Sequence, residues 1–167
     1  QIDLPIGNGI FGQNVQGVST RGPNGRSWVN KPEADKVCEL IAAIKEKCTE
    51  AMFGHLSMGV VTPFRAHQEY IGSKLDNMGL VDKVRVGTAH VFQGDEKDIM
   101  IFSPVVSKGM TANAARWVES PTNLFNVAIT RAKEALFFVG DMQACMSQPG
   151  VLGKFVEYVR TVRKLRD

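Results

Sequence analysis

The sequence predicts an α/β fold in which a mostly parallel sheet carries helices on both faces. One observation is a set of short, continuously apolar runs, which is typical of strands that are buried on both faces. These runs cover residues 58–62, 99–102 and 135–140. The other is that stretches with helical spacing and capping residues separate these runs, as expected when helical crossovers join parallel strands.

The first predicted helix runs from about Pro32 to about Lys47. Asn30 can cap it, Glu33 follows three residues later as in a capping box, and Pro32 suits the first turn. Apolar residues then recur at helical spacing, at Val37, Leu40, Ile41 and Ile44. We expect this helix to pack one face on the sheet and to carry no chemistry.

A buried strand is predicted at residues 58–62, and Thr62-Pro63 ends it and begins a second helix. The inner face of that helix is expected to carry Phe64, Ile71, Leu75 and Met78, and Gly79 ends it. The Thr62 hydroxyl and the first helical amides could hold a phosphate. Alternatively, Thr62 is only the N-cap of the helix.

The most informative stretch is VGTAHVFQGDEKDIMIFSP, residues 86–104. It confines its polar groups to one loop between two apolar runs, and loops at strand ends are where α/β sheets bind ligands. Gly94 allows a backbone to approach a ligand closely, and the charged cluster at residues 95–98 is too polar to be buried unless it is paired.

The last third of the chain is predicted to contain a long loop, two helices and a strand. Residues 107–119 lack periodicity and read as the loop, in which Arg116 and Trp117 either contact a nucleic acid strand or merely cover the sheet. Ser120-Pro121 begins a helix that brings Arg131 to the start of the strand at 135–140. Residues 151–166 form an amphipathic helix with a basic outer side.

Composition places the chain among ordinary globular domains. It has 167 residues, of which 44% are hydrophobic and 22% charged, and its net charge of +3 is compatible with nucleic acid without requiring it. No apolar stretch could span a membrane and no signal peptide opens the chain, so we expect a cytoplasmic protein. Three cysteines without a CxxC pair indicate reduced thiols and predict no metal site.

Residues 1–27 are predicted to be a flexible or loop-like leader to a domain at 28–167. The leader contains Gly7, Gly9 and Gly12, a literal GxGxxG, but we see no preceding strand and no following helix, so a dinucleotide site is not expected. Because the chain begins at Gln1, we expect it to be a piece of a longer protein.

Two segments resemble motifs of the superfamily 1 helicases. VGTAHVFQGDEKDIMIFSPV resembles their motif V, and NLFNVAITRAKEALFFVGD resembles their motif VI. FQGDEKD, NVAITRAK and the upstream VVTPF look most like the branch that contains the nonsense-mediated-decay RNA helicase and its DNA-acting relatives. The resemblance covers residues 28–141 and has both motifs in the expected order.

This resemblance implies the second of two RecA-like domains that close on ATP and Mg²⁺. It assigns Arg131 as the arginine finger, Gly94 and Glu96 to the nucleotide, and Thr88 and His90, together with Thr62, to single-stranded DNA or RNA. Gln93 would lie between the two sites. A permanently charged guanidinium is suited to the oxygens of a transferring phosphoryl group.

The sequence also departs from a complete motor. No GxxxxGK[ST] phosphate loop occurs, so ATP and Mg²⁺ would be bound mainly by the first RecA-like domain of the same protein, and this chain alone should not hydrolyse ATP. The leading hypothesis is the C-terminal motor half of an ATP-dependent helicase or translocase. The alternative is a non-enzymatic nucleic-acid-binding or interaction module that kept the fold.

Overall fold

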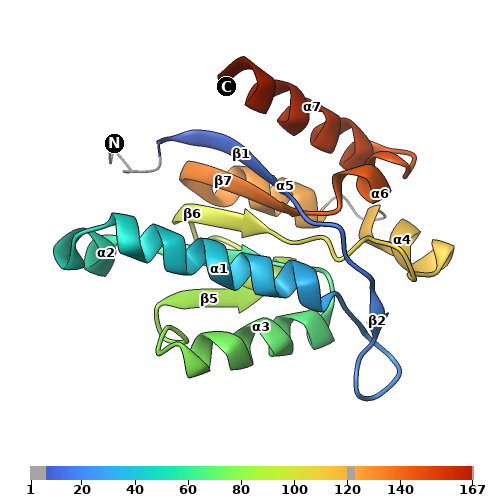
Figure 1. The fold of residues 1–167 in the computed structure, drawn as a ribbon, viewed down its shortest axis with the longest axis horizontal. Helices are drawn as coiled ribbons and strands as arrows, with labels where there is room; N and C mark the ends of the chain where they lie inside the picture. Colours follow the sequence, from blue (N-terminus) through green and yellow to red (C-terminus); the bar gives the residue numbers. More distant parts are fainter. Residues whose placement is uncertain (1–6, 120–122, 167) are drawn as a thin grey trace.

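A computed structural model describes residues 7–119 and 123–166, and Figure 1 shows that a single twisted sheet forms its centre. The sheet has five strands in the order β1-β7-β6-β4-β5, and every neighbouring pair is parallel. Its strands are β1 (Gly9–Asn14), β4 (Met58–Val61), β5 (Val84–Gly87), β6 (Lys97–Phe102) and β7 (Ala132–Gly140). A small antiparallel ribbon pairs β2 (Thr20–Arg21) with β3 (Trp28–Val29). The predicted fold class is confirmed.

Helices cover both faces because side chains alternate along each strand. Ile99 and Ile101 pack with α1 (Lys31–Lys47) and α3 (Arg65–Asn77), and α2 (Glu50–His55) adds Phe53 to this cluster. Met100 and Phe102 point to the opposite face. There they pack with residues of the 3₁₀ turn η1 (Ala89–Phe92) and of α4 (Ala112–Glu119), α5 (Asn123–Arg131), α6 (Met142–Met146) and α7 (Val151–Arg166). No helix in the described part of the chain combines the length and apolarity of a membrane span.

Helix α1 forms as its sequence predicts. The Asn30 side chain accepts a hydrogen bond from the Glu33 amide at 3.2 Å, which satisfies one of the free N–H groups of the first turn. Val37, Ile41 and Ile44 are buried against the sheet. The predicted cap at Asn30 is confirmed, but the Asn30 amide donates to His67, so the Glu33 half of the capping box does not form. The predicted buried face is confirmed except at Leu40, which is half-buried.

Strand β1 corrects the expectation of a loop-like leader over residues 1–27. Gly9–Asn14 pairs with β7 along its whole length, and Phe11 stacks on Phe137 with ring centroids 4.9 Å apart. The segment has few apolar residues, so its sequence gives no strand pattern; its hydrogen-bond partners come from the opposite end of the chain. Gly9 and Gly12 therefore lie within a strand, and not in a strand-to-helix turn.

Helix α4 corrects the expectation of an unstructured loop over residues 107–119. Thr111 caps it, since its hydroxyl accepts a hydrogen bond from the Ala114 amide at 3.2 Å. Ala115 is buried and anchors the helix on the core. Polar and small residues dominate the segment, and its helical state depends on this cap and on tertiary packing.

Three smaller expectations also need correction. Thr62 is not an N-cap, because α3 begins at Arg65 after Phe64 and has no side-chain cap. Met78, expected on the inner face, is exposed, since it lies at the end of α3 where the core no longer covers it. The helix start predicted at Ser120-Pro121 lies outside the described residues, and α5 is described from Asn123.

Candidate nucleotide and nucleic-acid sites

Three predicted nucleotide-site residues lie at the amino end of the sheet. Gly94 and Glu96 immediately precede β6, and Arg131 immediately precedes β7. Lys97 of β6 is paired with Ala132 of β7, so Glu96 and Arg131 stand one residue before the same rung of the ladder. Residues 35 positions apart in the sequence are thus brought to one edge of two neighbouring central strands.

Arg131 is the last residue of α5 and is half-buried. Its Nε atom is buried and has no hydrogen-bond partner among the described residues. A buried donor without an acceptor is costly, typically about 1–3 kcal/mol, so such a group is suited to an acceptor that arrives from outside. Phosphate oxygens are acceptors of this kind, and a guanidinium pairs with two of them at once. The residue fits a phosphoryl ligand.

The two acidic residues that follow Gly94 differ, because Asp95 is ion-paired and Glu96 is not paired with any described cation. Asp95 contacts Lys97 Nζ and Arg85 Nη1, each at 3.1 Å, and the hydrogen bond from Lys97 with the two positive charges lowers the pKa of Asp95. Glu96 is exposed and pairs with no described cation. Its carboxylate therefore remains available as an acceptor for a hydroxyl group. No cluster of three potential metal ligands occurs in the described residues.

Gly94 has a backbone φ of +72°, in the left-handed region, and a Cβ placed on it would meet no atom within 4 Å. The position is thus restricted by backbone conformation and not by crowding. We expect Gly94→Ala to lower the free energy of unfolding by about 1 kcal/mol, because this conformation strains a residue with a Cβ. Gly94→Asn should cost less, since asparagine tolerates this region. Urea unfolding of both variants measures the difference; equal costs would contradict the strain explanation.

The predicted strand-binding residues lie at or near the opposite, carboxyl end of the sheet. Thr88 follows β5 and is half-buried, and His90 is exposed in η1. Thr62 follows β4, but its side chain is fully buried and its Oγ1 has no partner among the described residues. A nucleic acid contact by Thr62 stays a prediction and would require an acceptor or donor to reach this buried hydroxyl.

The segment between β5 and β6 connects the two ends. It leaves β5 at its carboxyl end, crosses β4 as η1 and enters β6 at its amino end, with the exposed Gln93 following η1. Phe92 of η1 packs over Gly59 of β4, where a Cβ would come within 2.7 Å of the ring, so a larger residue would require the ring to move. Helix α5, which carries Arg131, packs on both η1 and β6.

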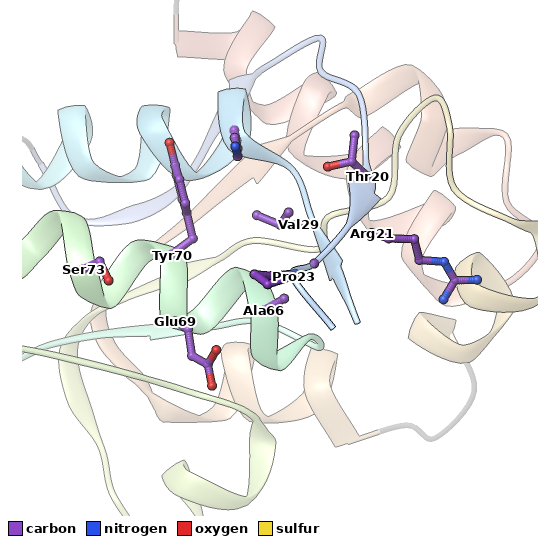
Figure 2. A pocket seen from close by; sticks show the side chains of 10 residues that line it. Thr20, Arg21, Pro23, Val29, Ala66, Glu69, Tyr70 and Ser73 are labelled. Carbon is purple, nitrogen blue, oxygen red and sulfur yellow. The ribbon is translucent and has the colours of Figure 1, made fainter. Parts of the chain in front are cut away.

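Pockets lie elsewhere at the carboxyl end. One pocket of about 520 Å³ lies between the β2–β3 ribbon and helices α1 and α3. Figure 2 shows Thr20 and Arg21 on one side of it and Glu69, Tyr70 and Ser73 on another. Neither this pocket nor two others of about 510 and 450 Å³ contains a predicted site residue. Of the predicted residues, His90, Gln93, Gly94 and Glu96 are exposed, Thr88 and Arg131 are half-buried, and Thr62 is buried.

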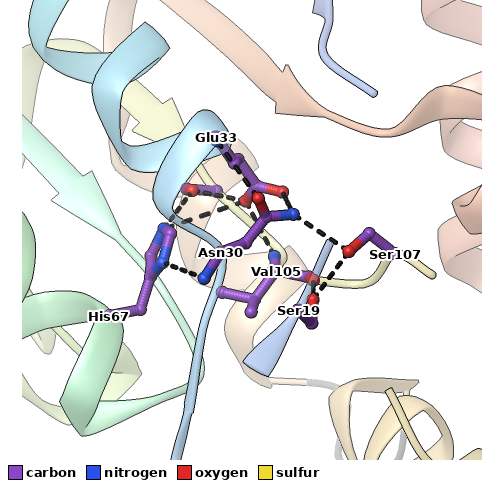
Figure 3. Close-up of polar contacts among 7 residues, drawn as sticks. Ser19, Asn30, Glu33, His67, Val105 and Ser107 are labelled. Atoms are coloured by element: carbon purple, nitrogen blue, oxygen red, sulfur yellow. Dashed lines mark hydrogen bonds and ion pairs between the residues drawn. The ribbon is translucent and has the colours of Figure 1, made fainter. Parts of the chain in front are cut away.

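A buried polar network supports the carboxyl end, and sequence reasoning missed it (Figure 3). Glu33 is fully buried; its Oε1 accepts hydrogen bonds from Ser103 Oγ and, at 2.8 Å, from the Val105 amide. Val105 has a φ of +70°, which is strained for a β-branched residue. Glu33, assigned from sequence only to a capping box, therefore holds the chain that leaves β6.

The same network contains a buried histidine. Asn30 N–H donates to His67 Nδ1 at 3.2 Å, so the ring proton lies on Nε2, which donates to Ser103 Oγ at 2.8 Å. Ser103 donates onward to Glu33. All four residues are buried, so the Ser–His–Glu arrangement faces no substrate and acts as support. Ser103, His67 and Glu33 come from three separate segments, and no local pattern predicts that they meet.

Burial raises the pKa of Glu33 from 4.5 to about 8 and lowers the pKa of His67 from 6.5 to about 3. Between pH 4.5 and 8 the folded chain holds a proton on Glu33 that the unfolded chain releases, which lowers stability as pH rises. Between pH 3 and 6.5 the unfolded chain holds an extra proton on His67, which has the opposite effect. The two effects offset each other where they overlap.

We therefore expect stability to change little from pH 4.5 to 6.5 and then to fall by about 2 kcal/mol up to pH 8. Glu33→Gln, which has no proton to release, should lack this fall. Urea unfolding at several pH values tests both statements. A variant that loses stability as steeply as the wild type over this interval would show that another group is responsible.

Comparison with known proteins identifies the family. A family model described as an AAA domain matches residues 6–143. The chain belongs to this family. It is a C-terminal RecA-like domain of the superfamily 1 helicases. The match includes β1, which agrees with its place in the sheet.

The helicase domain is similar to a short part of several much longer proteins. It is 31% identical to human RNA helicase Mov10l1 over 147 residues, which is 86% of this chain and 12% of that protein. It is 30% identical to regulator of nonsense transcripts 1 of Dictyostelium discoideum, over 84% of this chain and 10% of that protein. An uncharacterised ATP-dependent helicase of Methanocaldococcus jannaschii is 27% identical over 98% of this chain and 23% of its own length.

Proposed function

We propose that this chain is the C-terminal motor half of an ATP-dependent helicase or translocase that moves on single-stranded DNA or RNA. The observation that carries the proposal is the division of the predicted residues between two ends of one sheet. Gly94, Glu96 and Arg131 lie at the amino end, and Thr88 follows β5 at the carboxyl end. One surface for nucleotide and another for a strand are what a strand-dependent motor needs.

In this function, Arg131 would reach the terminal phosphate of a nucleotide that a first RecA-like domain binds. Its buried Nε, which has no partner in the described part of the chain, supports this role, because closure of the two domains would supply an acceptor. Glu96 would accept a hydrogen bond from a ribose hydroxyl. ATP with Mg²⁺ would supply the phosphoryl group and its counter-charge, with the metal bound mainly by the partner domain.

The crossover from Thr88 to Glu96 would couple the two surfaces. The crossover begins at the surface proposed for the nucleic acid and ends at the surface proposed for the nucleotide. It also packs on α5, the helix that carries Arg131. A shift of this segment on binding a strand would therefore change the position of Gln93 and of Arg131. Coupling of this kind is reciprocal, so nucleotide binding should alter strand affinity as well.

The test is ATP hydrolysis by the full-length protein that carries this chain, with and without single-stranded DNA or RNA. We expect that single-stranded DNA, single-stranded RNA or both stimulate ATP hydrolysis. Absence of hydrolysis under every condition, with strand binding retained, would contradict the motor and leave the alternative of a non-enzymatic nucleic-acid-binding module. A parallel binding titration distinguishes this outcome from a protein that binds neither ligand.

A further inference from the structure

Helix α4 lies beyond the carboxyl end of the sheet (Figure 1), and it carries an exposed tryptophan, Trp117. The Trp117 ring packs against Phe64, which comes two residues after Thr62, with ring centroids 5.3 Å apart and the planes tilted by 34°. Phe64 is 9% exposed, whereas Trp117 is 53% exposed. Phe64 thus covers part of the indole, and the rest of the ring is open to solvent.

The core beneath this pair holds it in place. Phe64 belongs to a buried cluster with Trp28 and Val105, against which Val118 of α4 also packs. The Arg21 guanidinium lies over the Trp28 ring, with its Cζ 4.3 Å from the ring centroid. The Trp117 ring is therefore presented on a supported surface, and a ligand that stacks on it need not first order a mobile side chain.

Each of the two aromatic residues has an arginine next to it in the sequence. Arg65 follows Phe64 in the sequence, its side chain is 85% exposed, and its contact is to Glu69 on the same helix at 3.3 Å. Arg116 precedes Trp117 and is also exposed, with its guanidinium held by Asn113 at 3.1 Å. Surface contacts of this kind are weak and leave the cations able to attract phosphates.

We propose that Trp117, supported by Phe64, stacks on an unpaired base of the strand bound at the carboxyl end of the sheet. The inference rests on the proposed function, because it requires a strand at that end. A single exposed ring suits one unpaired base, since every base has a face that can stack, and the exposed Arg65 and Arg116 are available to the phosphates of the strand. A protein partner would need a much larger apolar area than one ring offers.

The test compares the full-length protein with its Trp117→Ala variant in binding to oligo(dT) and oligo(U), and to abasic strands of the same length. Loss of a stacked base weakens binding by roughly 5- to 150-fold. We expect that loss for strands with bases and little change for abasic strands. Trp117→Phe should retain most of the affinity, because a phenyl ring also stacks.

Tyr158→Ala is the matched control, since Tyr158 is likewise 53% exposed and belongs to α7, a different helix from α4. It should bind every strand like the wild type. Trp117→Ala that binds like the wild type, or that loses affinity equally for abasic strands, would overturn the stacking role while the proposed function stands. A wild-type protein that binds no strand would overturn both.

Discussion

Replacing Arg131 with alanine in the full-length protein is expected to reduce the proposed ATP turnover by about three orders of magnitude or more. The guanidinium would stabilise charge that develops on the transferring phosphoryl group, and alanine offers no donor in its place. Steady-state hydrolysis at saturating strand measures the effect. Strand affinity should change little, because Arg131 precedes β7, at the end of the sheet opposite Thr88.

Lys133→Ala is a suitable control for Arg131→Ala. Lys133 is exposed and lies two residues after Arg131, at the start of β7. Its replacement removes a nearby positive charge but leaves the proposed contact between Arg131 and phosphate in place. We expect turnover close to that of the wild type. If Arg131→Ala also retains near-normal turnover, Arg131 is not the arginine finger of this protein.

Glu33→Ala is expected to lower the free energy of unfolding by about 3–5 kcal/mol. The change leaves the Val105 amide and the Ser103 hydroxyl without their buried acceptor and opens a cavity beside the strained Val105. Glu33→Gln keeps the shape and one acceptor oxygen, so it should cost much less at pH 6. Urea unfolding followed by circular dichroism gives both values.

Glu39→Ala provides the comparison on the same helix. Glu39 is exposed and pairs with Lys36 at 2.7 Å, and exposed pairs of this kind contribute about 0–1 kcal/mol. A Glu33→Ala variant no less stable than Glu39→Ala would show that the buried network does not support the fold.

The sequence correctly predicted those helices and strands that are stabilised by residues close to them in the chain. The α1 cap at Asn30 and the continuously apolar core of β6 depend on neighbouring residues, and both form as expected. Strand β1 and helix α4 were missed because their stability comes from β7 and from the cluster around Phe64, which lie far away in the sequence.

The candidate site shows the same division. The two helicase motifs led to Gly94, Glu96 and Arg131, and the fold brings all three to one end of the sheet. Motifs say nothing about the side chains that hold the site in place. His67 and Ser103 each look ordinary in their own segments, and only tertiary contact makes them partners of Glu33.

The place of β1 at the edge of the sheet has a consequence for folding during synthesis. Gly9 pairs with Ala135 and Asn14 with Gly140, so each contact joins residues 126 positions apart. Strands β4, β5 and β6 come from one stretch of 45 residues and can assemble early. Among the strands of this sheet, β1 is synthesised first and is the last to find its partner, and until β7 emerges its backbone groups can pair with the wrong strand.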